Sequence, residues 1–308
     1  MAPPAETDSA SDIRADHWVE RSAPVWTRPY LRLARIDRPI GTWLLLIPCW
    51  WGVALATAGL PGTNWPDPLL FVLFAIGALA MRGAGCCWND IVDRDFDGKV
   101  ARTALRPIPS GDLTVAQAVG FMGLLMLIGL LVLLPMNRIA GFVAAASLVL
   151  VVIYPLMKRV TYWPQFFLGL AFNWGVLVGW AAVAGGLALP AALLYAAGIA
   201  WTLGYDTIYA HQDKEDDALI GVKSTALKFG ADTKPWLWGF YAATIALMAA
   251  AGWTAGLAWP FHACLAAGAA QLAWQVMVLD IGSPTDCLAK FHSNRLFGFI
   301  VLAGMVAG

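Results

Sequence analysis

The chain has 308 residues, of which 59% are hydrophobic and only 13% are charged. Charged residues make up about a quarter of an average soluble protein, so this composition argues against a soluble globular fold. The 20 Lys and Arg residues balance 20 Asp and Glu residues, which excludes a nucleic-acid-binding protein that relies on a basic surface.

Long stretches without a charged side chain alternate with short charged segments. A membrane-spanning helix needs about 20 apolar residues, so the uncharged stretches 160–205 and 235–279 must each contain two helices joined by a turn. Gly185 with Gly186 marks the first turn, and the segment 252–260 marks the second. The sequence therefore predicts an all-α, polytopic membrane protein with nine transmembrane helices, at 41–60, 68–88, 113–134, 139–156, 164–185, 188–208, 236–255, 259–280 and 292–308.

The placement of basic residues supports this count. With the amino terminus in the cytoplasm, 19 of the 20 Lys and Arg residues lie on the cytoplasmic side, and only Arg138 lies across the membrane. This distribution follows the positive-inside rule and predicts a carboxyl terminus outside. Acidic residues share the bias, although the rule does not sort them, so their clustering needs another cause.

The polar segment 1–40 precedes the first predicted helix. It contains acidic residues and no apolar signal-peptide core, so we expect neither a cleaved signal peptide nor a transit peptide. We expect an integral protein of a bacterial cell inner membrane, with an active site on the cytoplasmic side. Residues 26–38 have the pattern of a short amphipathic helix in the membrane interface. The chain therefore divides into a cytoplasmic amino-terminal segment, 1–40, which contains this helix, and a transmembrane domain, 41–308.

The first acidic cluster follows the helix predicted at 68–88. Asn89, Asp93 and Asp97 are spaced i, i+4, i+8, and Asp90 lies beside them. If the helix continues through this segment, the three lie on one face and direct their oxygens into one space.

A second acidic cluster follows the helix predicted at 188–208. Asp206, Asp213 and Asp217 lie at i, i+7 and i+11 and would again share a helical face. Carboxylates at this density repel one another, and their desolvation next to hydrocarbon is costly, so a cation should lie between them. Carboxylate oxygens without a preformed cage suit Mg²⁺, which binds through a few carboxylates together with substrate phosphates. The alternative is that each cluster is a solvated loop.

These motifs resemble those of the UbiA superfamily of intramembrane prenyltransferases. The family signature N-D-x-x-D-x-x-x-D is matched by Asn89, Asp90, Asp93 and Asp97, and its D-x-x-x-D signature is matched by Asp213 and Asp217. Further similar segments are 35–41, 102–111, 154–159 and 220–226, and the stretch 205–213 is most similar to the branch that uses 4-hydroxybenzoate.

The resemblance implies an activity and a metal site. Mg²⁺ would be held by Asp93, Asp97, Asp213 and Asp217, with Asn89, Asp90 and Asp206 as further ligands or as residues behind them. The metal would stabilise the diphosphate that leaves a polyprenyl diphosphate, and the ring carbon of 4-hydroxybenzoate ortho to its hydroxyl would accept the prenyl group, a step of ubiquinone biosynthesis.

Basic and aromatic residues near the motifs are candidate substrate contacts. We expect Arg159 to pair with the benzoate carboxylate, and a buried aromatic such as Tyr205, Trp174 or Trp201 to favour a nearby cation. The residues expected to contact phosphate are Arg38, Arg102, Arg106, Lys158 and Lys223. The alternative for the basic residues is that they only set membrane topology, and for the aromatic residues that they only pack or anchor at the interface. His211, inside the second motif, is better placed as a wall residue than as a base.

Three other functions share some of these sequence features. A related prenyltransferase acting on homogentisate, a dihydroxynaphthoate or a porphyrin would use much the same diphosphate site. A CDP-alcohol phosphatidyltransferase is excluded, because its signature requires Asp where Val115 and Val119 stand. A cation transporter would carry acids near the membrane midplane, whereas these acids collect at one face. Besides these substrates the sequence indicates membrane lipid as a partner, and it indicates no nucleic acid and no protein partner.

Overall fold

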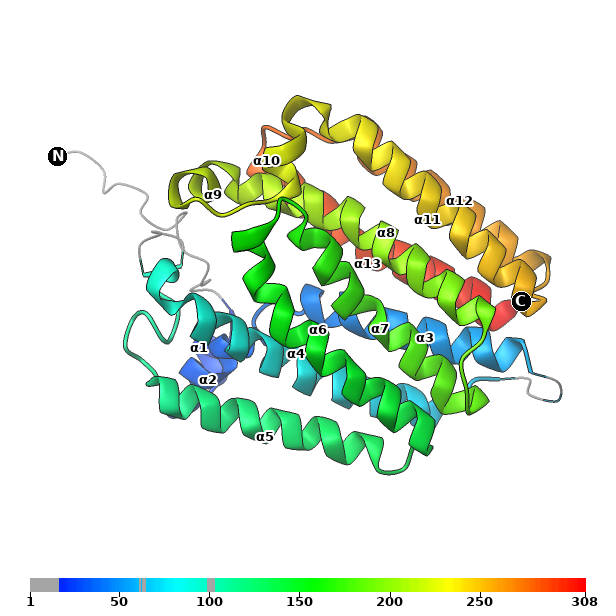
Figure 1. Cartoon of the computed structure of the whole chain (residues 1–308), viewed down its shortest axis with the longest axis horizontal. Helices are drawn as coiled ribbons and strands as arrows, with labels where there is room; N and C mark the ends of the chain where they lie inside the picture. The colour runs from blue at the N-terminus through cyan, green and yellow to red at the C-terminus, as the bar shows by residue number, and fades with distance from the viewer. Residues whose placement is uncertain (1–16, 61, 63–64, 99–102) are drawn as a thin grey trace. The chain divides into compact units, whose positions relative to one another are not determined.

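The computed structural model describes residues 17–60, 62, 65–98 and 103–308, and these form helices and turns without a strand (Figure 1). The all-α prediction is thus confirmed for the described residues. The long helices are α3 (Ile40–Ala58), α4 (Pro68–Asp97), α5 (Val115–Leu133), α6 (Arg138–Val160), α7 (Pro164–Ala184), α8 (Leu189–Ala210), α11 (Thr233–Ala255), α12 (Trp259–Val278) and α13 (Pro284–Ala307).

Seven helical segments of the described chain are long and apolar enough to cross a membrane. They are α3 to α7, the segment Thr225–Ala255 that contains α11, and α12. The predicted count of nine spans is therefore not confirmed, because α8 and α13 are outside this set. Helix α8 is close to the predicted range 188–208, whereas α13 begins at Pro284, eight residues before the predicted range 292–308. Both helices carry polar residues within their length, among them Asp206 in α8 and Lys290 in α13.

Short helices make up the rest: α1 (Trp18–Ser22), η1 (Val25–Thr27), α2 (Arg28–Leu33), η2 (His211–Asp213), α9 (Lys214–Ile220), α10 (Thr225–Phe229) and η3 (Gly230–Asp232). The amphipathic helix predicted at 26–38 is wrong in extent. The α-helix there covers only residues 28–33, because the chain turns into a left-handed conformation at Arg35, where φ is 57°.

Local chemistry explains where the long helices begin and end. Pro occupies the first turn of α7, α8, α12 and α13, a position where its missing N–H is not needed. Asn137 caps α6 by accepting a hydrogen bond from the N–H of Ala140 at 2.9 Å. Gly185 ends α7 and Gly256 ends α11, both with positive φ. Both predicted turns are thereby confirmed.

The chain divides into two compact units, each described by itself. Unit 1 consists of Met1–Gly41 and Leu79–Leu130, and unit 2 of Thr42–Ala78 and Leu131–Gly308. In unit 1, Leu33 of α2 and Cys87 and Ile91 of α4 pack with Leu113 and Ala118. This small core fixes the acidic end of α4 against the amino-terminal helices.

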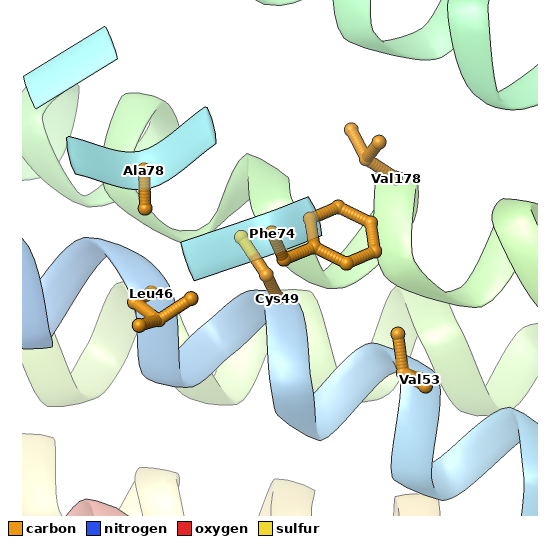
Figure 2. Close-up of a cluster of buried hydrophobic side chains, with 6 residues drawn as sticks. All are labelled: Leu46, Cys49, Val53, Phe74, Ala78 and Val178. Carbon is orange, nitrogen blue, oxygen red and sulfur yellow. The ribbon is translucent and has the colours of Figure 1, made fainter. Parts of the chain in front are cut away.

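Unit 2 contains a helix array that begins at α3. Helix α7 packs against α6 and α8, α8 against α11 and α13, and α12 against α11 and α13. Figure 2 shows one core cluster, in which Val178 of α7 lies with Leu46, Cys49 and Val53 of α3 and with Phe74 and Ala78 of α4.

Glycines allow α3 and α7 to approach closely. A Cβ added at Gly179 would overlap the carbonyl oxygen of Cys49, and one added at Gly52 would overlap the carbonyl oxygen of Val176. Both obstacles are backbone atoms, which cannot rotate away. Small residues spaced four apart, here Gly175 and Gly179, permit such helix contacts in membranes.

We therefore expect Gly179→Ala to lower the free energy of unfolding by about 1–3 kcal/mol, the range of overpacked cores. Gly141→Ala in α6 is the matched control, because an added Cβ there meets no atom within 4 Å. Thermal unfolding of the detergent-solubilised proteins measures both. An unchanged melting temperature for Gly179→Ala would contradict the close approach of α3 and α7.

Candidate active site

The helix predicted at 68–88 extends further, to Asp97, as α4. The condition for a shared face of the first acidic motif, a continuous helix, is therefore met. Asp90, Asp93 and Asp97, spaced i, i+3, i+7, form its buried face, with exposed fractions of 0%, 0% and 8%. Asn89 is half-buried beside them, whereas Asp95 is exposed. Because isolated carboxylates are costly to bury, each member of this face needs a compensating charge or donor.

Arg35 supplies that charge to Asp90. Its Nη2 donates to Oδ1 and Oδ2 of Asp90 at 2.8 and 3.0 Å, and its Nη1 donates to the carbonyl oxygen of Arg32 at 3.0 Å. Both side chains are buried. Arg35 lies inside a segment similar to the family, yet it was not among the predicted site residues, because its partner is 55 residues away.

Arg106 connects the two ends of the acidic face. Its Nη1 lies 2.8 Å from Oδ2 of Asp97 and 3.5 Å from Oδ1 of Asp90. Its loop is tied to α4 by Thr103, whose hydroxyl donates to the carbonyl oxygen of Asp97 at 2.8 Å. Arg102, also predicted as a phosphate contact, is outside the described residues.

The backbone of Arg35 adopts a conformation that normally favours Gly. The N–H groups of Arg35 and Ile36 donate to the carbonyl oxygens of Arg32 and Leu31, both at 3.0 Å, which is the Schellman ending of a helix. A left-handed conformation costs a non-Gly residue about 1–2 kcal/mol. The buried ion pair with Asp90 offsets that cost.

Other amino-terminal side chains brace this arrangement. Arg32 donates to both oxygens of Glu20 at 2.7 Å, and this bond lowers the pKa of Glu20 and raises that of Arg32. Arg38, a predicted phosphate contact, donates from Nε to Oδ2 of Asp37 at 3.0 Å. The other oxygen of Asp37 is buried without a hydrogen-bond partner among the described residues.

The second acidic motif lies in unit 2. The α-helix that carries Asp206 ends at Ala210, and a 3₁₀ turn brings the chain to Asp213, which has φ −109° and ψ 7°, before α9 carries Asp217. All three carboxylates are half-buried. The predicted single helical face is therefore interrupted, because a 3₁₀ turn has three residues per turn and rotates the later residues away from the face of α8.

His211 occupies the interruption as a buried residue. Its Nε2 lies 2.9 Å from the hydroxyl of Thr233. Burial, with a smaller contribution from Lys214, lowers the pKa of His211 to about 4. The imidazole is therefore neutral at neutral pH and is a weak base.

Two predicted basic segments of unit 2 meet through the main chain. The N–H of Lys223 donates to the carbonyl oxygen of Lys158 at 2.8 Å, and its Nζ donates to that of Val160 at 3.1 Å. Lys223 also lies over the ring of Tyr162. Arg159 is exposed in the last turn of α6.

Buried polar side chains hold this junction to α7 and α8. Gln165 Oε1 accepts from the N–H of Thr225 at 3.1 Å, and the hydroxyls of Thr207 and Thr225 lie 2.7 Å apart. None of the three was predicted. Their position beside the motifs was the only signal in the sequence.

The predicted aromatic residues are packed. Tyr205 is 1% exposed, with its ring centroid 5.0 Å from that of Trp201 and 5.8 Å from that of Phe291. Trp201 donates from Nε1 to Asn294 at 2.8 Å. Trp174 donates to the carbonyl oxygen of Val143 at 2.7 Å. In these contacts the three residues form walls of the helix array.

Among the described residues, no three His, Cys, Asp or Glu side chains are grouped to hold a metal ion. The two acidic motifs belong to different units, so each provides its own carboxylates. A metal that takes most of its ligands from water and substrate phosphates needs only one or two carboxylates from the protein. The donor set of Asp93 and Asp97 on one helical face fits that requirement.

The chain is similar to known proteins over nearly its whole length. It is 52% identical over 297 residues to "4-hydroxybenzoate polyprenyltransferase, mitochondrial" of Arabidopsis thaliana, covering 96% of this chain and 72% of that protein. The human protein of the same name is 52% identical over 93% of this chain and 77% of its own length. These names contradict the predicted bacterial cell inner membrane, because both relatives are mitochondrial.

Solved structures share the fold. A UbiA homolog from Aeropyrum pernix K1 superimposes with a TM-score of 0.74 at 24% identity, over 86% of this chain and 97% of that one. A UbiA homolog from Archaeoglobus fulgidus, bound to GPP and Mg²⁺, gives a TM-score of 0.70 at 18% identity, over 91% and 98%. The family model for "UbiA prenyltransferase family" matches residues 45–301. The chain therefore belongs to the UbiA prenyltransferase family.

Proposed function

We propose that this protein transfers a polyprenyl group from a polyprenyl diphosphate to the carbon of 4-hydroxybenzoate ortho to its hydroxyl, releasing diphosphate, as a step of ubiquinone biosynthesis. The observation that carries the proposal is the buried face of Asp90, Asp93 and Asp97 with Arg35 and Arg106, at the end of a long apolar helix. The relatives named for this activity support the acceptor, and their names point to a mitochondrial membrane.

We propose Mg²⁺ as the metal of this site. Asp93 and Asp97 of α4 would hold an ion, with Asn89 and Asp90 beside them. In the second motif, Asp213 and Asp217 would be the carboxylate ligands, with Asp206 beside them. When bound, the ion supplies Lewis-acid stabilisation of the leaving diphosphate. The homolog bound to GPP and Mg²⁺ supports this choice.

The basic residues then position the anionic parts of the substrates. Arg38, Arg106, Lys158 and Lys223 supply charge for diphosphate oxygens, and Arg102 has the same role on sequence grounds. Arg159, exposed at the end of α6, offers a planar fork for the benzoate carboxylate. Charge-assisted bonds of this kind are about twice as strong as neutral ones.

The apolar helices have a chemical role as well. As the carbon–oxygen bond breaks, its electron pair leaves with the diphosphate and the prenyl carbon becomes an allylic cation. The phenol ring forms the new carbon–carbon bond and then loses its ring proton. Tyr205 and Trp201, edge to face in the interior, contribute a wall whose ring faces favour positive charge and whose apolar surface excludes water.

Membranes that contain the protein should form a 3-polyprenyl-4-hydroxybenzoate from a short prenyl diphosphate and 4-hydroxybenzoate when Mg²⁺ is present. Mass spectrometry of the product measures the reaction. Homogentisate, a dihydroxynaphthoate and a porphyrin, supplied in parallel, test the acceptor. Full transfer in excess chelator would contradict the metal site, and preference for another acceptor would contradict the choice of 4-hydroxybenzoate.

Asp93→Asn and Asp213→Asn should each lower turnover by about 100-fold or more, because an amide does not replace the charge that stabilises the leaving diphosphate. Asp95→Asn is the matched control, since Asp95 lies in the same motif segment but its side chain is 76% exposed. Initial rates at equal amounts of folded protein in the membrane give the comparison. Near-normal turnover of either motif variant would refute its assignment.

Arg159→Ala should raise the KM for 4-hydroxybenzoate by about tenfold, the value of one charge-assisted hydrogen bond, with a smaller effect on the diphosphate. Arg138→Ala is the control, because it removes an exposed Arg from the opposite end of the same helix. Steady-state kinetics with each substrate varied separately distinguish the effects. An equal rise for both substrates would assign Arg159 to the diphosphate instead.

A further inference from the structure

Asp90 and Asp97 differ in the charges that surround them, although they belong to one face of α4. Asp90 is bonded through both oxygens to Arg35 and also lies near Arg106. Among the described residues, the ion pair of Asp97 is with Arg106, at 2.8 Å. If the guanidinium of Arg106 moved away, the charge of Asp90 would stay compensated, whereas that of Asp97 would become available to another cation.

Arg35 is held more firmly than Arg106. Its backbone is fixed by two hydrogen bonds of the Schellman ending, its side chain is buried, and its Nη1 is also bonded to the carbonyl oxygen of Arg32. The main chain of Arg106 also makes two hydrogen bonds, with Thr103 and Ser110. Its side chain extends from the loop that follows α4, is 15% exposed, and divides its Nη1 between Asp97 and Asp90. The two guanidinium groups therefore have different freedom to change partners.

Asp90 and Asp97 are neutralised without a metal, because they are paired with two guanidinium groups, Arg35 and Arg106. Asp93 lies on the same buried face as a third carboxylate. A divalent metal that binds Asp97 would be repelled by Arg106 if the guanidinium stayed in place. A diphosphate offers Arg106 acceptor oxygens of higher charge, to which a guanidinium can donate two parallel hydrogen bonds.

We propose that Arg106 is an exchangeable counter-ion of Asp97. Without substrate, Arg106 neutralises Asp97. When the metal and diphosphate arrive together, the guanidinium moves to phosphate oxygens and Asp97 becomes a metal ligand. Asp90, held by Arg35, remains a positioning residue that keeps Arg106 close through the exchange. This inference rests on the proposed function. It adds that the binding of the metal and the binding of the diphosphate are coupled through the side chain of Arg106.

The test measures binding by the full-length, detergent-solubilised protein. Mn²⁺ is the probe, because it takes the same oxygen ligands as Mg²⁺ and free Mn²⁺ can be counted by electron paramagnetic resonance. Its affinity is measured alone and with saturating inorganic diphosphate, for the wild type, Arg106→Gln and Arg94→Gln. Arg94→Gln is the matched control, because Arg94 is exposed on the same helix and is paired with the exposed Asp95.

Arg106→Gln should bind Mn²⁺ alone about threefold to tenfold more tightly than the wild type, because the competing cation is gone. In Arg106→Gln, the factor by which diphosphate raises the affinity for Mn²⁺ should be smaller to a similar extent. Arg94→Gln should match the wild type in both measurements. A general structural defect would weaken Mn²⁺ binding in both conditions. Weaker or unchanged binding of Mn²⁺ alone by Arg106→Gln would overturn the proposal.

Two further variants keep the experiment decisive. Helical circular dichroism shows whether Arg106→Gln folds. If it does not, Arg106→Lys should show the same two changes, in the affinity for Mn²⁺ alone and in the effect of diphosphate, at smaller size. An ammonium group cannot contact both Asp90 and Asp97 as a planar guanidinium does. Asp90→Asn should weaken the diphosphate effect more than the affinity for Mn²⁺ alone, whereas a ligand role for Asp90 would weaken both equally. A wild type that binds neither Mn²⁺ nor diphosphate would refute the proposed function itself.

Discussion

The structure of unit 1 depends on the cost of placing carboxylates beside hydrocarbon. Asp90 is completely buried, and a buried charge without a partner costs several kcal/mol even after the protein relaxes. Its bonds to Arg35 therefore join the end of α2 to the acidic end of α4 and hold the chain in a conformation that Arg disfavours. The small core of Leu33, Cys87 and Ile91 packs around this connection.

Most helices follow from local properties of the sequence. Apolar length predicts α3 to α7, the prolines begin helices, and Gly185 and Gly256 end them. The i, i+4 spacing of Asn89, Asp93 and Asp97 gives a shared face only if the helix continues past residue 88, and α4 does continue to Asp97. Each of these features is set by residues within one or two helical turns of one another, so a pattern in one sequence contains the information.

The remaining features depend on partners far apart in the chain. The pairing of Arg35 with Asp90 spans 55 residues, and that of Gln165 with Thr225 spans 60, so no local pattern indicates either. The helix expected at 26–38 is shorter because the chain turns into a left-handed conformation at Arg35. A Gly at this position would have indicated the turn, whereas an Arg does not. The second motif departs from a single face because a 3₁₀ turn follows Ala210, and the sequence contains no Pro or Gly at that point to announce it.

The same contrast explains how identical side chains on one helix can have different roles. Spacing alone treats Asp90, Asp93 and Asp97 as equivalent, since all three lie on the buried face of α4. Their neighbours separate them: a rigid, buried guanidinium makes the charge of Asp90 part of the fold, whereas a guanidinium on a loop leaves that of Asp97 open to exchange. Burial in a membrane protein makes a charged carboxylate costly, so each carboxylate depends on the basic side chain that compensates it. The function of each acid therefore follows from which basic side chain contacts it and how firmly that side chain is held.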